Sequence, residues 1–315
     1  MKVLGVNFSH NCSFAYFKNN VLKEYYEEDR FNKDKGFRPP HPFLGEYNYL
    51  SLDKFKNIVF DAVAISSFGA EEILLEKAHI ENILKKIKCK EVKFYYTQHH
   101  VHHALSGFYF SNFNEALGVV CDGGGERLNP PRHQFKALES IFYVDKKNVN
   151  YLYQHFSNID TDYFKVYNQI PCELNFKHRL LTQDNYMDLL CSNKLWAGLK
   201  YKRYKNQAGF GPNQEGQLMG VAAYKDKGTN IDKDVLEIAN KAQEETLEER
   251  IVLIKKATTY SDCKNIILSG GYHLNCSNNF KLVKHFPKLK FFIDPIPYDG
   301  GTAVGAAYYY ENFEN

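Results

Sequence analysis

The sequence lacks the features of membrane and secreted proteins. None of its apolar runs approaches the roughly 20 residues that a membrane-spanning helix needs, and the first residues enter a strand-like run, Lys2–Val6, without the apolar core and cleavage site of a secretion signal. The seven cysteines are scattered and form no CxxC pair, which argues against a disulfide framework or a cysteine zinc site. We therefore expect a soluble protein of the reducing cytoplasm, with no membrane partner.

A strong charge imbalance and a linker are also missing. The 40 basic and 37 acidic side chains give a net charge of only +3, which by itself does not point to a polyanionic partner. A hydrophobic content of 44% over 315 residues is ordinary for a globular enzyme with a real core. Because no low-complexity segment divides the chain, we expect lobes of one unit rather than tethered domains.

Short strands and helices alternate along the chain, which indicates an α/β fold. The spacing of apolar residues predicts strands at Val3–Asn7, Ser13–Phe17, Val21–Tyr26, Ile58–Ser66, Val92–Tyr96, Ala116–Cys121, Ser140–Val144, Tyr151–Gln154, Asn265–Leu268 and Lys290–Ile293. It predicts helices at Ala70–Ile87, Asp232–Lys256 and Gly300–Tyr310, further helices that begin near His99 and Tyr272, and mainly helical structure from about residue 157 to 257.

The first three strands form a β-meander, and the strands that begin at Ala116 repeat this pattern. Two such halves, each with helices and with a cleft between them, are the layout of the actin/hexokinase-like ATPase superfold. We expect lobe I at residues 1–112 and lobe II at residues 113–315.

A run of histidines at residues 99–103 gives the sharpest local signal. In a helix His99 and His103 stand four residues apart on one face, so both rings can bind a single ion. Asp299, in a turn between a strand and a helix, is a candidate third ligand. Two imidazoles and a carboxylate suit iron(II), manganese or zinc. A solvated histidine cluster and an aspartate helix cap are the alternatives.

Two glycine turns could hold a phosphate group, because glycine lets backbone N–H groups approach an anion. One follows a strand and the other lies between a strand and a helix. Neither matches a Walker loop or a GxGxxG fingerprint, so a plain tight turn is the alternative for each. The candidate nucleotide-binding residues are Asp122, Gly123, Gly124, Gly125, Gly270, Gly271 and Asn275.

Seven sequence blocks, in order along nearly the whole chain, resemble the N-terminal domain of the O-carbamoyltransferases of the nodulation-factor, cephamycin and tobramycin type. They are Gly5–Ser13, Glu28–Phe31, His99–Ala104, Asp122–Glu126, Glu215–Tyr224, Leu268–Cys276 and Asp299–Ala307. That domain is related to the tRNA threonylcarbamoyltransferases, which use the same fold.

The resemblance implies that His99, His103 and Asp299 bind iron or a similar divalent ion, and that the glycine turns hold the donor nucleotide. In the family a YrdC-like domain, C-terminal in the same chain, makes carbamoyl-adenylate from carbamoyl phosphate and ATP, and the domain seen here transfers the carbamoyl group. Because the sequence ends at Asn315, after the last helix, we expect that domain to be absent. Either a separate YrdC-like protein supplies the adenylate or the chain activates carbamoyl phosphate itself.

Two positions depart from the family pattern. The usual His-Asp of the first block is His10-Asn11 here, and Gln217 stands where the family commonly has lysine. His10 is the candidate base for the acceptor hydroxyl, since an imidazole titrates near neutral pH, and Asn11 is placed with it in the catalytic set. A structural histidine in a turn is the alternative.

The candidate segment for binding the acceptor is a basic, aromatic-rich run from Lys194 to Lys205 that includes Lys202 and Arg203. Such a mixture can follow a phosphate backbone and stack on bases, although a solvated helix face explains it equally. With Arg30 as a further acceptor-binding candidate, we hypothesise that the acceptor is a 5-hydroxymethyl pyrimidine in DNA. The alternatives are a sugar or natural-product hydroxyl, a tRNA threonylcarbamoyltransferase activity, and a non-catalytic nucleotide-binding scaffold subunit.

Overall fold

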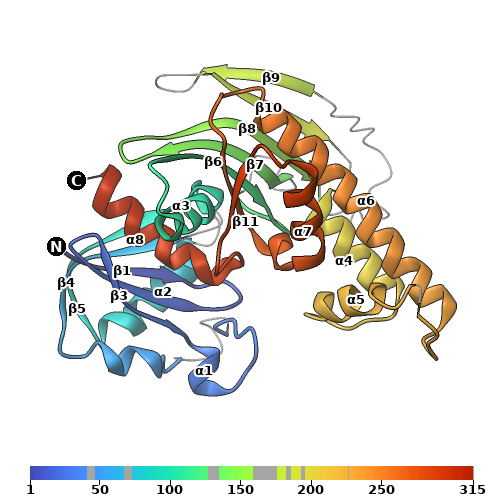
Figure 1. Ribbon diagram of the computed structural model, residues 1–315. Helices are drawn as coiled ribbons and strands as arrows, with labels where there is room; N and C mark the ends of the chain where they lie inside the picture. Colours follow the sequence, from blue (N-terminus) through green and yellow to red (C-terminus); the bar gives the residue numbers. More distant parts are fainter. Residues whose placement is uncertain are drawn as a thin grey trace, which may run out of the picture.

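The computed structural model describes residues 1–40, 47–66, 73–126, 135–158, 176–181, 186–192, 196–225 and 227–314 (Figure 1). It contains two mixed sheets of five and seven strands. The predicted α/β class is therefore confirmed.

The five-stranded sheet has the order β3-β2-β1-β4-β5. Its strands are β1 (Lys2–Asn7), β2 (Ser13–Lys18), β3 (Val21–Glu27), β4 (Val59–Ser66) and β5 (Lys88–Tyr95). β1, β2 and β3 form an antiparallel meander, and β4 and β5 continue the sheet in parallel with β1. The predicted opening meander is confirmed.

The seven-stranded sheet has the order β12-β11-β6-β7-β8-β10-β9. Its strands are β6 (Glu115–Cys121), β7 (Phe135–Asp145), β8 (Val149–Asn158), β9 (Phe176–Leu181), β10 (Tyr186–Ser192), β11 (Asn265–Ser269) and β12 (Lys290–Ile293). β6, β7 and β8 repeat the meander, and β11 and β12 run parallel to β6 as β4 and β5 do to β1. The two sheets therefore share one topology, with β10 and β9 added at one edge.

The helices cover both faces of each sheet. They are α1 (Asp29–Asn32), α2 (Ile73–Leu84), α3 (His99–Ser111), α4 (Ala197–Gln207), α5 (Glu215–Ala222), α6 (Lys233–Ala257), α7 (Cys276–His285) and α8 (Thr302–Phe313), with 3₁₀ turns η2 (Ser51–Lys54), η4 (Gly271–Leu274) and η5 (Asp299–Gly301). In Figure 1, α3 and α8 lie between the sheets, while α4, α6 and α7 cover the outer face of the larger one.

Successive side chains of β6 point to opposite faces of the larger sheet, and helices cover both faces. Leu117 and Val119 pack outward with α4 and α6, whereas Ala116 and Val120 pack inward with α3, as the two-residue period of a strand requires. α8 approaches the smaller sheet very closely, because a Cβ at Gly5 would lie 1.8 Å from the carbonyl oxygen of Ala303. The C-terminal helix thus packs on the N-terminal sheet.

One predicted region was partly wrong. Residues 157–257 were expected to be mainly helical, but β9 and β10 form an antiparallel pair at the edge of the larger sheet, with β10 parallel to β8. Helices follow only from Ala197. The start of the predicted helix at Ala70 lies outside the described residues, and the described helix is Ile73–Leu84. The division into lobes at residue 112 stays a prediction. Among the helices that the structure describes, none is both long and apolar enough to cross a membrane.

Candidate metal centre and the surrounding cleft

The predicted histidine helix begins at His99, and all four of its histidines are fully buried between the sheets. Glu126 anchors the first turn, because its carboxylate accepts the N–H of His100 at 3.0 Å. The rings of His100 and His102 each bond a serine hydroxyl, at 2.7 and 2.8 Å. These two rings are held in the core by the serines through Nδ1, whereas His99 and His103 turn their Nε2 atoms toward each other.

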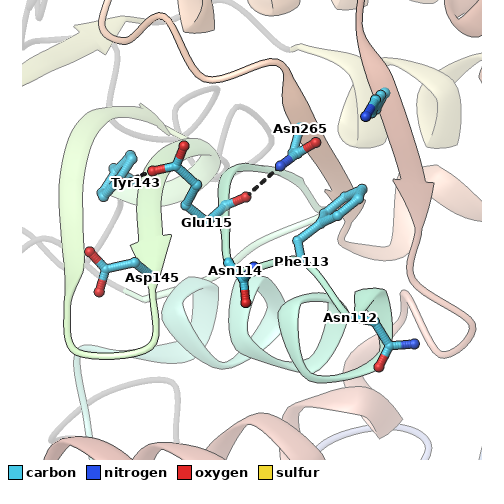
Figure 2. A pocket seen from close by; sticks show the side chains of 8 residues that line it. Asn112, Phe113, Asn114, Glu115, Tyr143, Asp145 and Asn265 are labelled. Atoms are coloured by element: carbon cyan, nitrogen blue, oxygen red, sulfur yellow. Dashed lines mark hydrogen bonds between the residues drawn. The ribbon is translucent and has the colours of Figure 1, made fainter.

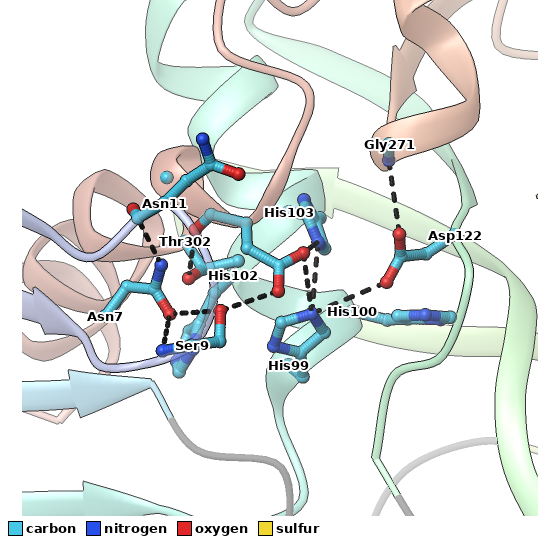
Figure 3. A network of polar contacts seen from close by, with 12 residues as sticks. Asn7, Ser9, Asn11, His99, His100, His102, His103, Asp122, Gly271 and Thr302 are labelled. Carbon is cyan, nitrogen blue, oxygen red and sulfur yellow. Dashed lines mark hydrogen bonds and ion pairs between the residues drawn. The ribbon is translucent and has the colours of Figure 1, made fainter. Parts of the chain in front are cut away.

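His99 and His103 meet two carboxylates from distant parts of the chain (Figure 3). The two Nε2 atoms are 3.2 Å apart, and each lies 3.7 Å from Oδ1 of Asp299. His99 Nε2 is also 3.7 Å from Oδ2 of Asp122, which directly follows β6. All four residues are buried, and one ligand atom from each lies within 4.8 Å of the others.

These separations fit a single ion. Ligand atoms about 2.1 Å from one metal ion at tetrahedral or octahedral angles lie roughly 3.0–3.4 Å apart. The two imidazoles already meet this condition, and Oδ1 of Asp299 needs to move by only a few tenths of an ångström, while all four ligand atoms lie within 4.8 Å of one another. Asp299 Oδ1 faces both rings and has no hydrogen-bond partner among the described residues. The residues present therefore suit a divalent ion bound by nitrogen and oxygen.

The protonation of the cluster reflects its mixture of charges. Burial opposes charge on His99, but the neighbouring carboxylates of Asp122 and Asp299 raise its pKa to about 10. Burial likewise opposes ionisation of Asp299, yet His10 and the two cluster histidines hold its pKa well below its usual range. The pocket therefore keeps its carboxylates ionised and favours a positive charge between them.

The loop between β1 and β2 of the five-stranded sheet contacts Asp299. Ser9 Oγ lies 2.6 Å from Asp299 Oδ2, and His10 Nε2 lies 3.2 Å from the same oxygen. His10 is 60% exposed, and the Asp299 carboxylate raises its pKa. Asn11 Oδ1 accepts a hydrogen bond from His10 Nδ1 at 2.8 Å, and Asn11 has a φ of 60°, a left-handed conformation that asparagine tolerates. The predicted catalytic pair thus lies beside the predicted metal ligand.

The two glycine turns lie against each other. Gly270 has a φ of +93°, and a Cβ there would lie 2.3 Å from the carbonyl oxygen of Cys121. The N–H of Gly271 donates to Asp122 Oδ1 at 3.3 Å, and that of Gly124 to Asp122 Oδ2 at 3.4 Å. Gly123 is exposed, whereas Gly125 is buried against His100. The turns are thus joined through Asp122 directly beside the histidines.

Asn275 was predicted to reach the nucleotide, but its amide is engaged within the protein. Its oxygen caps α7 by accepting the N–H of Asn278 at 3.2 Å, and its nitrogen donates to Gln243 of α6 at 2.9 Å. Any role in nucleotide binding stays a prediction.

The predicted acceptor residues lie on two surfaces. Lys202 and Arg203 are exposed on α4. Arg30 is 75% exposed and lies 3.4 Å from Asp29 and 3.9 Å from Glu27. Glu27 accepts the hydroxyl of Tyr298, the residue before Asp299, which places Arg30 near the metal cluster.

The other described members of the basic run pack within the protein. Lys200 pairs with Glu245 and Glu249 of α6, and Tyr204 donates to Glu245 at 2.8 Å. Tyr201 and Lys205 are buried, and Lys194 lies outside the described residues. The tyrosines of α4 are therefore engaged in packing against α6 and are not presented to solvent for base stacking.

A separate cavity of about 470 Å³ opens at the opposite end of the larger sheet (Figure 2). It lies at the first residues of β6, β11 and β12, whereas Asp122 follows the last residue of β6. Ligands of α/β sheets bind outside the carboxyl ends of the strands. The cavity is therefore remote from the metal cluster. It is lined by Asn112, Phe113, Asn114, Glu115, Tyr143, Asp145, Asn265 and Lys290.

Sequence reasoning did not place Asp122 in the metal cluster, nor did it single out Ser9. Asp122 follows a predicted strand, as a ligand at a sheet edge often does, and this signal was assigned to phosphate binding. Ser9 stands next to a candidate base but has no spacing that points to Asp299, which is 290 residues away. Only the fold brings them together.

Comparisons with known proteins show which families the chain resembles. The sequence profile of a family described as "Carbamoyltransferase N-terminus" matches residues 203–308. Nodulation protein NolNO of Sinorhizobium fredii (strain NBRC 101917 / NGR234) is 25% identical over 332 residues, which cover 95% of this chain and 46% of NolNO. The chain spans about half the length of the curated relatives that it matches.

Solved structures share the fold at low sequence identity. Full-length HypF in its phosphate- and nucleotide-bound form has a TM-score of 0.60 at 13% identity, covering 98% of this chain and 55% of HypF. A ROK family protein from Streptococcus pneumoniae TIGR4, in complex with sucrose, has a TM-score of 0.51 at 11% identity, covering 98% of this chain and 97% of that protein. Together with the duplicated sheet order, these structures confirm the actin/hexokinase-like fold. The predicted resemblance to the N-terminal domain of carbamoyltransferases is therefore also confirmed.

Proposed function

We propose that this chain is a carbamoyltransferase domain that moves a carbamoyl group from an activated donor onto an acceptor hydroxyl at a metal centre. The observation that carries the proposal is the buried cluster of His99, His103, Asp122 and Asp299, whose ligand atoms lie within 4.8 Å of one another beside two glycine turns. The family match supports the reaction class.

These four residues would hold iron(II) or another divalent ion such as manganese or zinc. When bound, such an ion supplies a Lewis acid for charge that develops on a carbonyl or phosphate oxygen. The protein's part is to hold the four side chains before the ion arrives, and complete burial of both imidazoles removes competing water from that face. Replacing His99 or His103 would therefore remove an ion ligand rather than a surface contact.

The glycine turns would bind the phosphate portion of the donor, with the backbone around Gly123 and Gly124 open to a ligand. The donor would be carbamoyl-adenylate, made from carbamoyl phosphate and ATP by a YrdC-like activity. The phosphate- and nucleotide-bound state of HypF supports this donor class by analogy of fold. Adding a YrdC-like protein to the assay separates an external supply of the adenylate from activation by this chain.

His10 would accept the proton of the acceptor hydroxyl. Its ring is exposed and therefore accessible to a substrate, and its contact with Asp299 fixes the orientation of the ring. Bringing the hydroxyl and the carbamoyl carbon together in this geometry can contribute about 7–11 kcal/mol to catalysis. Asn11 would hold the orientation of the ring through Nδ1.

The proposed acceptor is a 5-hydroxymethyl pyrimidine in DNA. Exposed cations, Lys202 and Arg203 on α4 and Arg30 beside Glu27 and Asp29, support a phosphate-bearing acceptor. Sugar and natural-product hydroxyls are the competing acceptors. Loss of activity on DNA after K202A and R203A, with activity on the free nucleoside kept, would favour DNA, and an unchanged rate on DNA would exclude these contacts.

The reaction is tested by incubating the iron-loaded chain with carbamoyl phosphate, ATP, and a panel of DNA, sugar and natural-product hydroxyls, with and without a YrdC-like protein. Mass spectrometry of the acceptors identifies the transferred group. A carbamoyl adduct is the expected product, and a threonylcarbamoyl adduct on tRNA or no adduct on any acceptor contradicts the proposal. H103Q should abolish transfer, while H102Q, which changes a buried histidine of the same helix that bonds Ser66, is the matched control.

A further inference from the structure

Asp299 uses its two oxygens for different purposes. Oδ1 faces the Nε2 atoms of His99 and His103, at 3.7 Å from each. Oδ2 faces the loop between β1 and β2, where the hydroxyl of Ser9 lies 2.6 Å away and His10 Nε2 lies 3.2 Å away. One carboxylate therefore joins the ion-binding pair to the loop that carries the candidate base.

The hydroxyl of Ser9 has one proton and several neighbours. Asn7 Oδ1 lies 2.7 Å away and the carbonyl oxygen of His10 3.1 Å away. Asp299 is the only one of these acceptors that carries a full charge, and hydrogen bonds to carboxylates are roughly twice as strong as neutral ones. The proton therefore points to Asp299 Oδ2.

The rest of the loop holds Ser9 in this position. Asn7 accepts the backbone N–H of Ser9 at 2.9 Å. The amide nitrogen of Asn7 donates to the carbonyl oxygens of His10 and Asn11, at 3.3 and 3.2 Å. These bonds fix the orientation of the Asn7 amide, so the turn is built around a buried serine that is only 6% exposed.

We infer that Ser9 is a positioning residue that holds Asp299 as a monodentate metal ligand. By occupying Oδ2, the hydroxyl leaves Oδ1 as the oxygen presented to the ion. A carboxylate that binds through one oxygen leaves a coordination position open, which a catalytic site keeps for its substrate. This inference rests on the proposed metal centre and adds a residue outside the four ligands.

The arrangement also links two segments that are far apart in the sequence. Asp299 begins η5, directly before α8, whereas Ser9 and His10 lie between β1 and β2. An ion at Oδ1 would be bound by the same carboxylate that Ser9 and His10 contact at Oδ2. Ser9 therefore sets the position of the loop relative to the ion.

The test is a cobalt(II) titration of the full chain under anaerobic conditions, followed by the visible d–d absorption of the bound ion. S9A leaves His10 as the remaining contact of Oδ2, so this oxygen can turn toward the ion, which would raise the coordination number and weaken the absorption. Outer-shell partners of metal ligands typically contribute about 10- to 100-fold to affinity, so the Kd of S9A should rise by that factor. S9T keeps the hydroxyl and should restore both the Kd and the spectrum.

S13A is the matched control. Ser13 is also buried, and it donates at 2.8 Å to the carbonyl oxygen of Gly300 in the same turn, without touching the carboxylate. It should leave the spectrum unchanged. If S9A does not fold by circular dichroism, S9C, which keeps the volume with a weaker donor, takes its place.

The outcomes separate the inference from the metal centre. A wild-type chain that binds no cobalt overturns the proposed centre and the inference together. A wild-type chain that binds cobalt, with S9A matching it in Kd and spectrum, overturns the role of Ser9 alone. A spectral change in S13A equal to that in S9A shows general loosening of the turn and also overturns it.

Discussion

Replacing Gly270 by alanine should damage the protein far more than the same change at Gly123 in the other glycine turn. Gly270 has a φ of 93° and a ψ of 149°, a conformation that is nearly exclusive to glycine and costs other residues about 1–3 kcal/mol. The added Cβ would lie 2.3 Å from the carbonyl oxygen of Cys121, against 3.4 Å where ordinary contact begins. The backbone at Gly270 or at Cys121 must therefore move.

The expected loss of stability follows from these two effects. Overpacking of a tight site costs about 1–3 kcal/mol, so strain and overpacking together give about 2–6 kcal/mol, a large share of the roughly 5–15 kcal/mol that stabilises a typical protein. Relaxation moves the β11–η4 turn away from β6. This removes the bond from Gly271 to Asp122 at 3.3 Å, so metal affinity should fall as well.

Urea unfolding followed by circular dichroism measures the loss of stability, and a divalent-ion titration measures the affinity. The control is G123A, because a Cβ there meets nothing within 4 Å and φ lies outside the left-handed region. G123A should change the free energy of unfolding by less than about 0.5 kcal/mol. Equal stability of the two variants would refute the reasoning.

Three further changes test other parts of the account. H10Q should lower kcat for carbamoyl transfer while metal content, measured by elemental analysis, stays the same; a lost metal ion would instead make His10 a ligand. R250M should reduce the free energy of unfolding in urea by about 3–5 kcal/mol, because it leaves Glu139 of the fully buried Arg250–Glu139 pair without its cation. Adding E139Q to R250M should recover much of this loss. An unchanged free energy of unfolding in R250M would contradict the role of this ion pair. Burial lowers the pKa of His273 to about 3 from an ordinary 6.5, so the unfolded chain binds the proton first and stability falls as pH drops from 6.5 toward 3. H273Q should reduce that slope in urea titrations by up to about 1.4 kcal/mol per pH unit, and an unaltered slope would show that other groups cause it.

The sequence alone could predict what depends on local spacing. The two meanders follow from period-two apolar runs, and His99 and His103 share a helix face because they are four residues apart. β9 and β10, which extend the larger sheet beyond β8, were missed because periodicity alone does not separate a short apolar strand from a helical segment.

What joins distant segments could not be predicted in this way. Asp122 was assigned to phosphate binding because a glycine turn follows it, and its position beside His99 depends on α3 packing across β6. The tyrosines of α4 suggested base stacking, yet their hydroxyls bond α6, as Tyr204 does with Glu245. Composition shows that such side chains are present but not which surface buries them.

The central claim is that His99, His103, Asp122 and Asp299 hold one ion, and anomalous diffraction from a crystal grown with manganese(II) tests it most directly. The account predicts one strong anomalous peak per chain, about 2.0–2.3 Å from both Nε2 atoms and from a carboxylate oxygen of Asp299. A crystal with no peak between these residues, or with its strongest peak elsewhere, would contradict it.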